Sequence, residues 1–288
     1  MKMIKPIVNI SKVIEEYDTI VVGLRGVLSD GLHVKQEALN TLIQLKKQGK
    51  RIVLITNSPM RVVTLAKYLQ ASKVPVAVFD SIVTAGEIMH YKLKFPKDAY
   101  KALGTTFFNV GKATDLGVFN GLDYIKVKDM NKSDFLYVSG VNDPNDTIDK
   151  YFPMLEHAAS LSIPFVCCGN DTSTFMDGQI SLSAGALAEQ YAVLGGTIVT
   201  LGKPETTILE YALDGIENLT QEGTIFLGDS LTTDIKSANS LGIASILISK
   251  GVHVNFLGEG YIPDVARTRD LATNFDAYPD FVISNVRW

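Results

Sequence analysis

The chain has 288 residues and a formal net charge of −4 at pH 7, and 46% of its residues are hydrophobic while 20% are charged. This composition is typical of a globular protein that is long enough for one large domain or two modest ones. The acidic balance disfavours a general role in binding nucleic acid or a membrane surface, and no uninterrupted apolar run is long enough to span a bilayer.

The first part of the chain alternates short apolar runs with segments of helical periodicity. Strands are predicted at residues 19–22 and 51–55, because both runs are rich in β-branched residues and end in residues that favour turns. The next predicted elements are helices at 36–48, about 60–70 and 81–93, and a short strand at 76–79. This β-α-β-α-β order predicts an α/β fold with a parallel sheet and right-handed crossovers.

The remaining predicted elements continue the mixed α/β pattern. Strands are predicted at 107–110, 124–127, 135–139, 164–168, 198–201, 224–227, 244–248 and 281–283, helices at 147–160, 182–194, 206–213 and 234–240, and a turn at 175–178. The simplest account of this order is a segment inserted between two halves of one sheet. We therefore expect a core domain of residues 1–80 and 197–288 and an inserted domain of residues 81–196.

The two cysteines, Cys167 and Cys168, are adjacent in the sequence. Disulfide geometry is hard to meet between neighbours, so we expect two buried, reduced thiols, although vicinal thiols can also bind soft metals. Reduced thiols fit the cytoplasm. Residues 1–11 contain lysines but no apolar core followed by a cleavage site, so no signal peptide is expected.

Polar side chains follow several of the predicted strands, at the edge of the sheet where α/β proteins bind their ligands. Thr56 and Asn57 follow the strand at 51–55, where a hydroxyl and backbone amides can hold an anion, although by themselves Asn57 or Ser58 are more often a simple helix cap. Lys203 follows the strand at 198–201. It can neutralise phosphate charge, although a lone lysine is more often merely solvated.

Two aspartates follow the predicted strand at 224–227. Asp229 and Asp234 can hold Mg²⁺ through a few oxygens and several waters, or Asp234 can cap the next helix while Asp229 serves a turn, and the sequence weighs both readings equally. His253 lies near another strand end but lacks partners, so we do not expect it to bind a ligand. By contrast, residues 23–27 after the first strand contain no acid, serine, cysteine or histidine.

In this order the segments resemble the haloacid dehalogenase (HAD) superfamily. ITNS at 55–58, GKP at 202–204 and FLGDSLTTDI at 226–235 look like its second, third and fourth motifs. The insert, with AGAL at 184–187 ahead of Gly195-Gly196, is similar to the α/β cap of the NagD-like branch (class IIA), which contains sugar-phosphate, nucleotide and 4-nitrophenyl phosphatases. The resemblance implies a Rossmann-like core with an inserted α/β cap, an ancestral Mg²⁺ cofactor and a small phosphorylated substrate.

The first motif departs from the pattern that the resemblance implies. The family has Asp-x-Asp-Gly-Val after the first strand, and this chain has GLRGV at 23–27, with Gly26 in register. Gly23 then takes the place of the nucleophile, which forms an aspartyl-phosphate and binds Mg²⁺ beside the acids that map to Asp229 and Asp234. Arg25 takes the place of the general acid/base. Glycine supplies no nucleophile, and arginine stays protonated.

We therefore expect weak or absent phosphatase activity together with retained binding of phosphate or a phosphorylated metabolite. The residues expected to form that site are Thr56, Asn57, Lys203 and Gly26, with Asn170 and Asp171 of the cap as further contacts. We also expect Arg25 to balance the charge of Asp229 and Asp234 in place of Mg²⁺, so that no cofactor need be present.

Two other functions stay open at this level. One is an active Mg²⁺-dependent phosphomonoester hydrolase, acting on a sugar phosphate or a nucleotide, that uses another nucleophile or an activated water. Asp18 and Asp30 are poor replacements for the nucleophile, because Asp18 should lie at the far end of the strand and Asp30 in a downstream loop. The other is a structural partner of an active homologue, and the sequence leaves the oligomeric state open, a homo-oligomer included.

Overall fold

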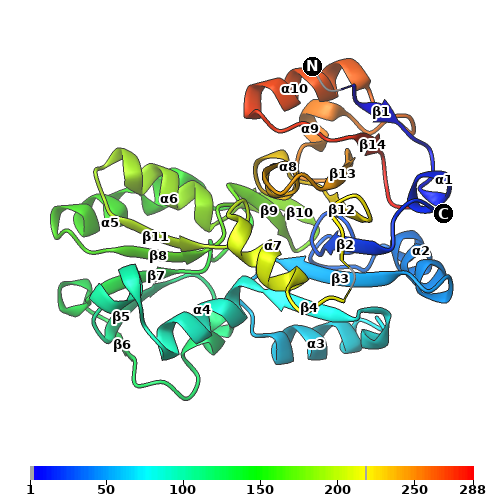
Figure 1. Ribbon diagram of the computed structural model, residues 1–288. Helices are drawn as coiled ribbons and strands as arrows, with labels where there is room; N and C mark the ends of the chain where they lie inside the picture. Colours follow the sequence, from blue (N-terminus) through cyan, green and yellow to red (C-terminus); the bar gives the residue numbers. More distant parts are fainter. Residues whose placement is uncertain (1–2, 218) are drawn as a thin grey trace.

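The computed structural model describes residues 3–217 and 219–288, and these residues form two parallel sheets with helices packed on their faces (Figure 1). The larger sheet is seven-stranded, in the order β1-β14-β13-β12-β2-β3-β4. Its strands are β1 (Lys5–Pro6), β2 (Thr19–Gly23), β3 (Arg51–Thr56), β4 (Ser81–Thr84), β12 (Thr224–Gly228), β13 (Ala244–Ile248) and β14 (Phe281–Ile283). Every pairing in it is parallel, as the sequence predicts.

The larger sheet is buried on both faces because successive side chains of a strand point in opposite directions. In β2, Ile20 and Val22 belong to one apolar cluster and Val21 belongs to another. The helices of this core domain are α1 (Ser11–Ile14), α2 (Gln36–Lys47), α3 (Val62–Ala71), α7 (Thr206–Leu213), α8 (Lys236–Ser240), α9 (Val254–Leu257) and α10 (Val265–Phe275), with a 3₁₀ turn at Val76–Val78 and a π-helical turn at Leu231–Ile235.

The smaller sheet is five-stranded and carries the inserted domain, here called the cap. Its order is β11-β8-β7-β5-β6, all parallel. The strands are β5 (Thr106–Val110), β6 (Ile125–Val127), β7 (Phe135–Val138), β8 (Phe165–Cys168) and β11 (Ile198–Leu201). The helices are α4 (Ala85–Lys94), α5 (Ile148–Ser160) and α6 (Ala184–Val193), with 3₁₀ turns at Asp98–Ala102, Ala113–Phe119 and Met130–Lys132.

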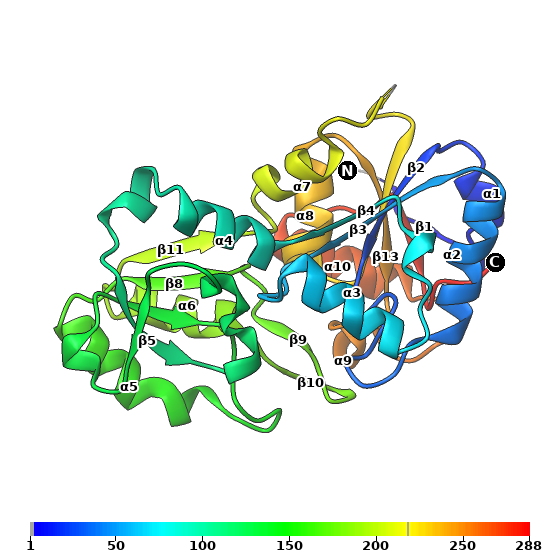
Figure 2. The ribbon, with the colours of Figure 1, turned by 90° about the horizontal axis from the view of Figure 1, so that it is seen from below.

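An antiparallel hairpin reaches from the cap to the core domain. It consists of β9 (Ser173–Met176) and β10 (Gln179–Leu182), which turn at Asp177 and Gly178. Both ribbon views show it extending toward the larger sheet (Figures 1 and 2). One apolar cluster also runs from Val21 of β2 through Met89 of α4 to Tyr137 of β7, so the two domains share part of their hydrophobic core.

Several sequence predictions need correction. The predicted strand at 76–79 is a 3₁₀ turn, and the predicted helix at 81–93 begins with β4, which pairs with β3 in the core sheet. The strand at 198–201 pairs with β8 in the cap sheet, not with the core sheet. Sheet membership therefore extends the core to Thr84 and the cap to Leu201. The hairpin was predicted only as a turn, and α10 was not predicted.

The insertion between two halves of one parallel sheet is confirmed, because strands from both ends of the chain pair in the larger sheet. Cys167 and Cys168 are buried and free, as expected. Among the helices of the described ranges, none is both long and apolar enough to cross a membrane.

Candidate functional site

The carboxyl ends of the central strands open into a cavity of about 260 Å³ between the core and the cap. Gly23, Thr56, Lys203, Asp229 and Asp234 all line it, so the segments that the sequence singled out do converge. The hairpin residues from Ser173 to Asp177 line the opposite side. The site is therefore formed by both domains.

The end of β2 has space for a side chain but carries none. A Cβ placed on Gly23 would lie 3.3 Å from Val27 Cγ2 and 3.7 Å from Asp234 Oδ2. The first distance asks for a small shift of the valine side chain, and the second is ordinary contact. Position 23 therefore has room for a Cβ, but it carries no carboxylate.

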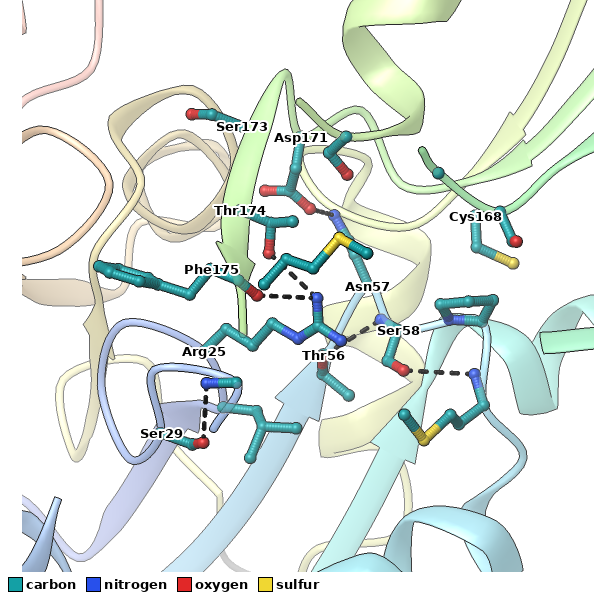
Figure 3. A pocket seen from close by; sticks show the side chains of 18 of the residues that line it. Arg25, Ser29, Thr56, Asn57, Ser58, Cys168, Asp171, Ser173, Thr174 and Phe175 are labelled. Carbon is teal, nitrogen blue, oxygen red and sulfur yellow. Dashed lines mark hydrogen bonds between the residues drawn. The ribbon is translucent and has the colours of Figure 1, made fainter. Parts of the chain in front are cut away.

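Arg25 lies on the cavity floor and points at the hairpin (Figure 3). Its Nη1 donates to the carbonyl oxygen of Phe175 at 3.0 Å and lies 3.5 Å from Thr174 Oγ1. Within the described residues no carboxylate lies within ion-pair distance of the guanidinium. The expected pairing of Arg25 with Asp229 and Asp234 is therefore wrong.

The reason is that both aspartates already have other partners. Asp234 Oδ1 accepts from Lys203 Nζ at 2.5 Å, and its Oδ2 accepts from the backbone N–H of Asp229 at 2.9 Å and of Ser230 at 3.2 Å. Asp229 Oδ2 accepts from Val252 N at 2.9 Å. Arg25 donates instead to the Phe175 carbonyl of the hairpin.

Asp229 is packed tightly against the turn after β2. A Cβ on Gly26, whose φ is +77°, would come within 1.7 Å of Asp229 Oδ2, so only glycine fits there. The N–H of Gly26 donates to Ser29 O at 2.8 Å, and its carbonyl accepts from Lys35 Nζ at 2.5 Å. Gly26 therefore makes room for Asp229 instead of offering an amide to an anion, contrary to the sequence prediction.

The pKa values of Asp229 and Lys203 are both raised above their ordinary values. Burial, followed by the charge of Asp234, raises the pKa of Asp229 to about 8. Burial lowers the pKa of Lys203, but Asp234, Asp171 and Asp229 more than offset this and raise it overall. At neutral pH Lys203 is therefore charged where it contacts Asp234, and Asp229, whose pKa is about 8, is largely protonated.

These residues do not fit Mg²⁺. In the described part of the chain no group of three or more histidine, cysteine or acidic side chains is placed to hold a metal ion. Mg²⁺ needs several carboxylate and water oxygens in near-octahedral geometry. Here Asp234 is held by an ammonium and two amides, and position 23 contributes no oxygen.

Asn57 organises the contact between the core and the cap. Its Oδ1 accepts from Lys203 N at 2.8 Å, and its Nδ2 donates to Lys203 O at 3.0 Å and to Asp171 Oδ2 at 2.7 Å. Asp171 Oδ1 accepts from Thr233 Oγ1 at 2.7 Å. Asp171 thus lines the cavity, whereas Asn170 Oδ1 accepts from Thr200 Oγ1 at 3.0 Å, inside the cap.

Thr56 is buried at the end of β3, and its Oγ1 accepts from Ser58 N at 3.1 Å. The hydroxyl hydrogen stays available for a ligand. Lys35, Asp115, Thr174 and Phe175 also lie in or beside the site, and no sequence motif singles them out. The turn signal of Asp177 and Gly178 between short apolar runs could have indicated the hairpin that carries the last two residues.

His253 is a structural residue, as its lack of partners in the sequence indicated. Its Nε2 accepts from Leu231 N at 2.9 Å at the start of the π-helical turn, and burial lowers its pKa to about 4. Because the neutral form is required, the unfolded chain binds more protons between about pH 6.5 and 4. Stability contributed by His253 is present above this window and is lost as the pH falls through it.

Because of this histidine, we expect the free energy of unfolding to fall by about 2 kcal/mol when the pH is lowered from 7 to 5. Denaturant unfolding at both pH values measures it. His253→Gln keeps a neutral acceptor and does not titrate, so its pH-dependent loss should be smaller by that amount. Other groups titrate in the same range, and the difference between the two proteins isolates the histidine. Equal losses in both would show that His253 is charged in the folded protein.

The protein has a parallel α/β core under an inserted α/β cap, and threonine, lysine and paired aspartates lie at the strand ends. It therefore belongs to the α/β proteins that bind a ligand at the carboxyl ends of parallel strands. A family model described as haloacid dehalogenase-like hydrolase matches residues 20–119, and one described as HAD-hydrolase-like matches residues 200–287. The chain belongs to the haloacid dehalogenase-like superfamily.

Solved structures agree with this assignment. A haloacid dehalogenase-like hydrolase from Brucella suis is 25% identical, covers 96% of this chain and 98% of its own, and has a TM-score of 0.80. A possible sugar phosphatase from Cytophaga hutchinsonii is 18% identical, with coverages of 99% and 98% and a TM-score of 0.73. A 4-nitrophenylphosphatase from Thermotoga maritima is 23% identical, with coverages of 95% and 96% and a TM-score of 0.62. The last two show likeness of fold.

A curated relative named triosephosphate isomerase, from Methanobacterium bryantii, is 28% identical over 100 residues. The match covers 34% of this chain, and the chain spans only 44% of that protein's length. This short likeness carries no statement about the activity of this chain.

Proposed function

We propose that this chain is a catalytically silent, or very weakly active, relative of the HAD phosphatases that binds phosphate or a small phosphorylated metabolite. One observation carries the proposal. The groups suited to hold an anion meet in one cavity, while the end of β2 offers glycine and a cap-directed arginine where the family resemblance places two aspartates.

Anion binding is supported by the charge and position of Lys203. Its side chain is only 6% exposed, and it lies in the same cavity as the Thr56 hydroxyl. An ammonium ion held at a water-poor site attracts phosphate much more strongly than one on the surface. Asp234 offsets part of that charge. Asp229 has a pKa of about 8, so it is largely neutral at pH 7 and does not repel an anion.

The lack of a nucleophile is supported by the positions of the two nearest acids in the sequence. The Asp18 side chain is 94% exposed at the start of β2, where it lies 3.9 Å from Lys50 Nζ. Asp30 Oδ1 accepts from Leu32 N at 2.8 Å and from His33 N at 2.5 Å in its own loop. Covalent attack needs the reacting atoms within about 3–3.5 Å, and neither acid faces the cavity in a way that would allow it.

The test combines an activity assay with a binding assay. We expect no hydrolysis of 4-nitrophenyl phosphate above the buffer rate with Mg²⁺, and the same result for Asp229→Ala. We expect calorimetry with inorganic phosphate to show saturable binding. Turnover that disappears in Asp229→Ala would contradict the silent site, and absence of any heat with phosphate would contradict the retained binding.

One observation favours the alternative of an active phosphomonoester hydrolase that uses an activated water. Asp171 enters the cavity from the cap, and burial raises its pKa, as a general acid or base would require. Its oxygens are nevertheless held by Asn57 and Thr233. If the alternative holds, Asp171→Asn should lower the rate by about 100-fold or more.

The free, buried cysteines support a reducing location such as the cytoplasm.

A further inference from the structure

Arg25 presents an unused edge of its guanidinium to the cavity. The side chain carries five N–H donors, and in the described residues only Nη1 has a protein partner, at Phe175 and Thr174 in the hairpin (Figure 3). Neither Nε nor Nη2 is among the buried polar atoms that lack a partner, so both are open to the cavity that Arg25 lines. The Nε–Nη2 edge is the one that binds a carboxylate or phosphate with two parallel hydrogen bonds.

The charge of Arg25 also lacks a local counterion. Burial lowers its pKa, and the carboxylates that oppose this effect, Asp115, Asp171 and Asp177, all lie beyond ion-pair distance within the described chain. Asp171 is held by core side chains, and Asp177 lies 3.7 Å from Lys112 Nζ. A half-buried cation without a counterion is costly, and an anionic group on a ligand would remove that cost.

Arg25 and Lys203 both line the cavity, but they contact different groups. Arg25 donates to the Phe175 carbonyl of the hairpin, whereas Lys203 donates to Asp234 of the core domain. The acids whose charges act on Lys203 are Asp234, Asp171 and Asp229, whereas those that act on Arg25 all belong to the cap. The cavity volume of about 260 Å³ suits a small metabolite.

We propose that Arg25 forms a second anion subsite, and that the ligand is a small phosphate ester with a second anionic group, either a carboxylate or another phosphate. The ester phosphate is held at Lys203 and Thr56, and the second anion is held by the Nε–Nη2 edge of Arg25. This inference rests on the proposed phosphate binding. It gives the substitution at position 25 a positive role in ligand selection.

The test compares two probes that differ by one group. 3-Phosphoglycerate and glycerol 3-phosphate share the phosphate and the three-carbon chain, but one ends in a carboxylate and the other in a hydroxymethyl group. Calorimetry on the full chain should give a dissociation constant about tenfold or more lower for 3-phosphoglycerate, as expected for a charge-assisted bidentate bond. Pyrophosphate, compared with inorganic phosphate, asks whether a second phosphate serves as well as the carboxylate.

Arg25→Gln is the matched variant, because the amide can still donate to Phe175 O but carries no charge. Its preference for 3-phosphoglycerate over glycerol 3-phosphate should fall to within about twofold. Arg25→Lys should restore part of the preference, since it keeps the charge without the bidentate edge.

Three outcomes decide the matter. Equal affinity of the unmodified chain for both esters, and for pyrophosphate and phosphate, overturns the second subsite while leaving phosphate binding intact. A preference that survives in Arg25→Gln places the second anion elsewhere and also overturns it. If inorganic phosphate and both esters all fail to bind, the proposed function itself is wrong. The comparison in the unmodified chain decides even if a variant does not fold.

Discussion

A double variant, Gly23→Asp with Arg25→Asp, is expected to hydrolyse 4-nitrophenyl phosphate at least about 100-fold faster than the unmodified chain when Mg²⁺ is present, since a positioned general acid alone contributes about 10²–10⁴-fold. A Cβ fits at position 23, where it would lie 3.3 Å from Val27 Cγ2 and 3.7 Å from Asp234 Oδ2. The added carboxylate would supply the oxygen donor that Mg²⁺ lacks here. Initial rates as a function of Mg²⁺ concentration measure the gain.

The matched control is Gly23→Asn with Arg25→Asn, which has the same shape but no carboxylates. It should show no gain, and Gly23→Asp alone should form a phosphoenzyme slowly because no acid protonates the leaving group. A double variant that folds, binds phosphate and still shows no Mg²⁺-dependent turnover would mean that the site departs from its relatives in more than these two residues.

The second large effect is expected at Lys203. Replacing it with methionine removes the ammonium and leaves Asp234, whose side chain is 4% exposed, as an unpaired buried carboxylate. Breaking a buried pair in this way costs about 3–5 kcal/mol, so the unfolding midpoint in denaturant should fall clearly. Inorganic phosphate should bind at least about 100-fold more weakly, because the main counter-charge at the inherited anion site is gone.

A second substitution separates the two losses. Lys203→Met with Asp234→Asn removes both charges, so it should regain most of the stability while phosphate binding stays lost. Asp234→Asn alone keeps the amide-accepting oxygen and leaves Lys203 without its carboxylate, and should bind phosphate at least as tightly as the unmodified chain. Phosphate binding that survives in Lys203→Met would remove Lys203 from the anion site.

The main architecture was predictable from periodicity, while the membership of strands in sheets was not. The buried runs at 19–22, 51–55 and 224–227 are the centre of the core sheet, as their β-branched composition indicates. The run at 198–201 looks equally buried, but apolar composition does not say which sheet a strand joins, and it pairs with β8 of the cap. Helix α10 escaped prediction because it buries only a few side chains, among them Thr268 and Leu271.

The sequence predicts which residues lie at the strand ends of the site, but it does not predict their hydrogen-bond partners. Thr56, Lys203 and Asp229 meet because parallel strands bring their carboxyl ends to one edge. The direction of Arg25 depends on facts that the sequence does not show. The oxygens of Asp229 and Asp234 are taken by Val252 N and Lys203 Nζ, and the hairpin places the Phe175 carbonyl within reach.

The most direct test is intact-mass measurement of the unmodified chain after it reacts with 4-nitrophenyl phosphate and Mg²⁺ and is quenched in acid, which preserves an acyl phosphate. We predict an unchanged mass, beside a phosphorylated fraction in the double aspartate variant as the positive control. A gain of one phosphoryl group on the unmodified chain would show that it has a nucleophile after all.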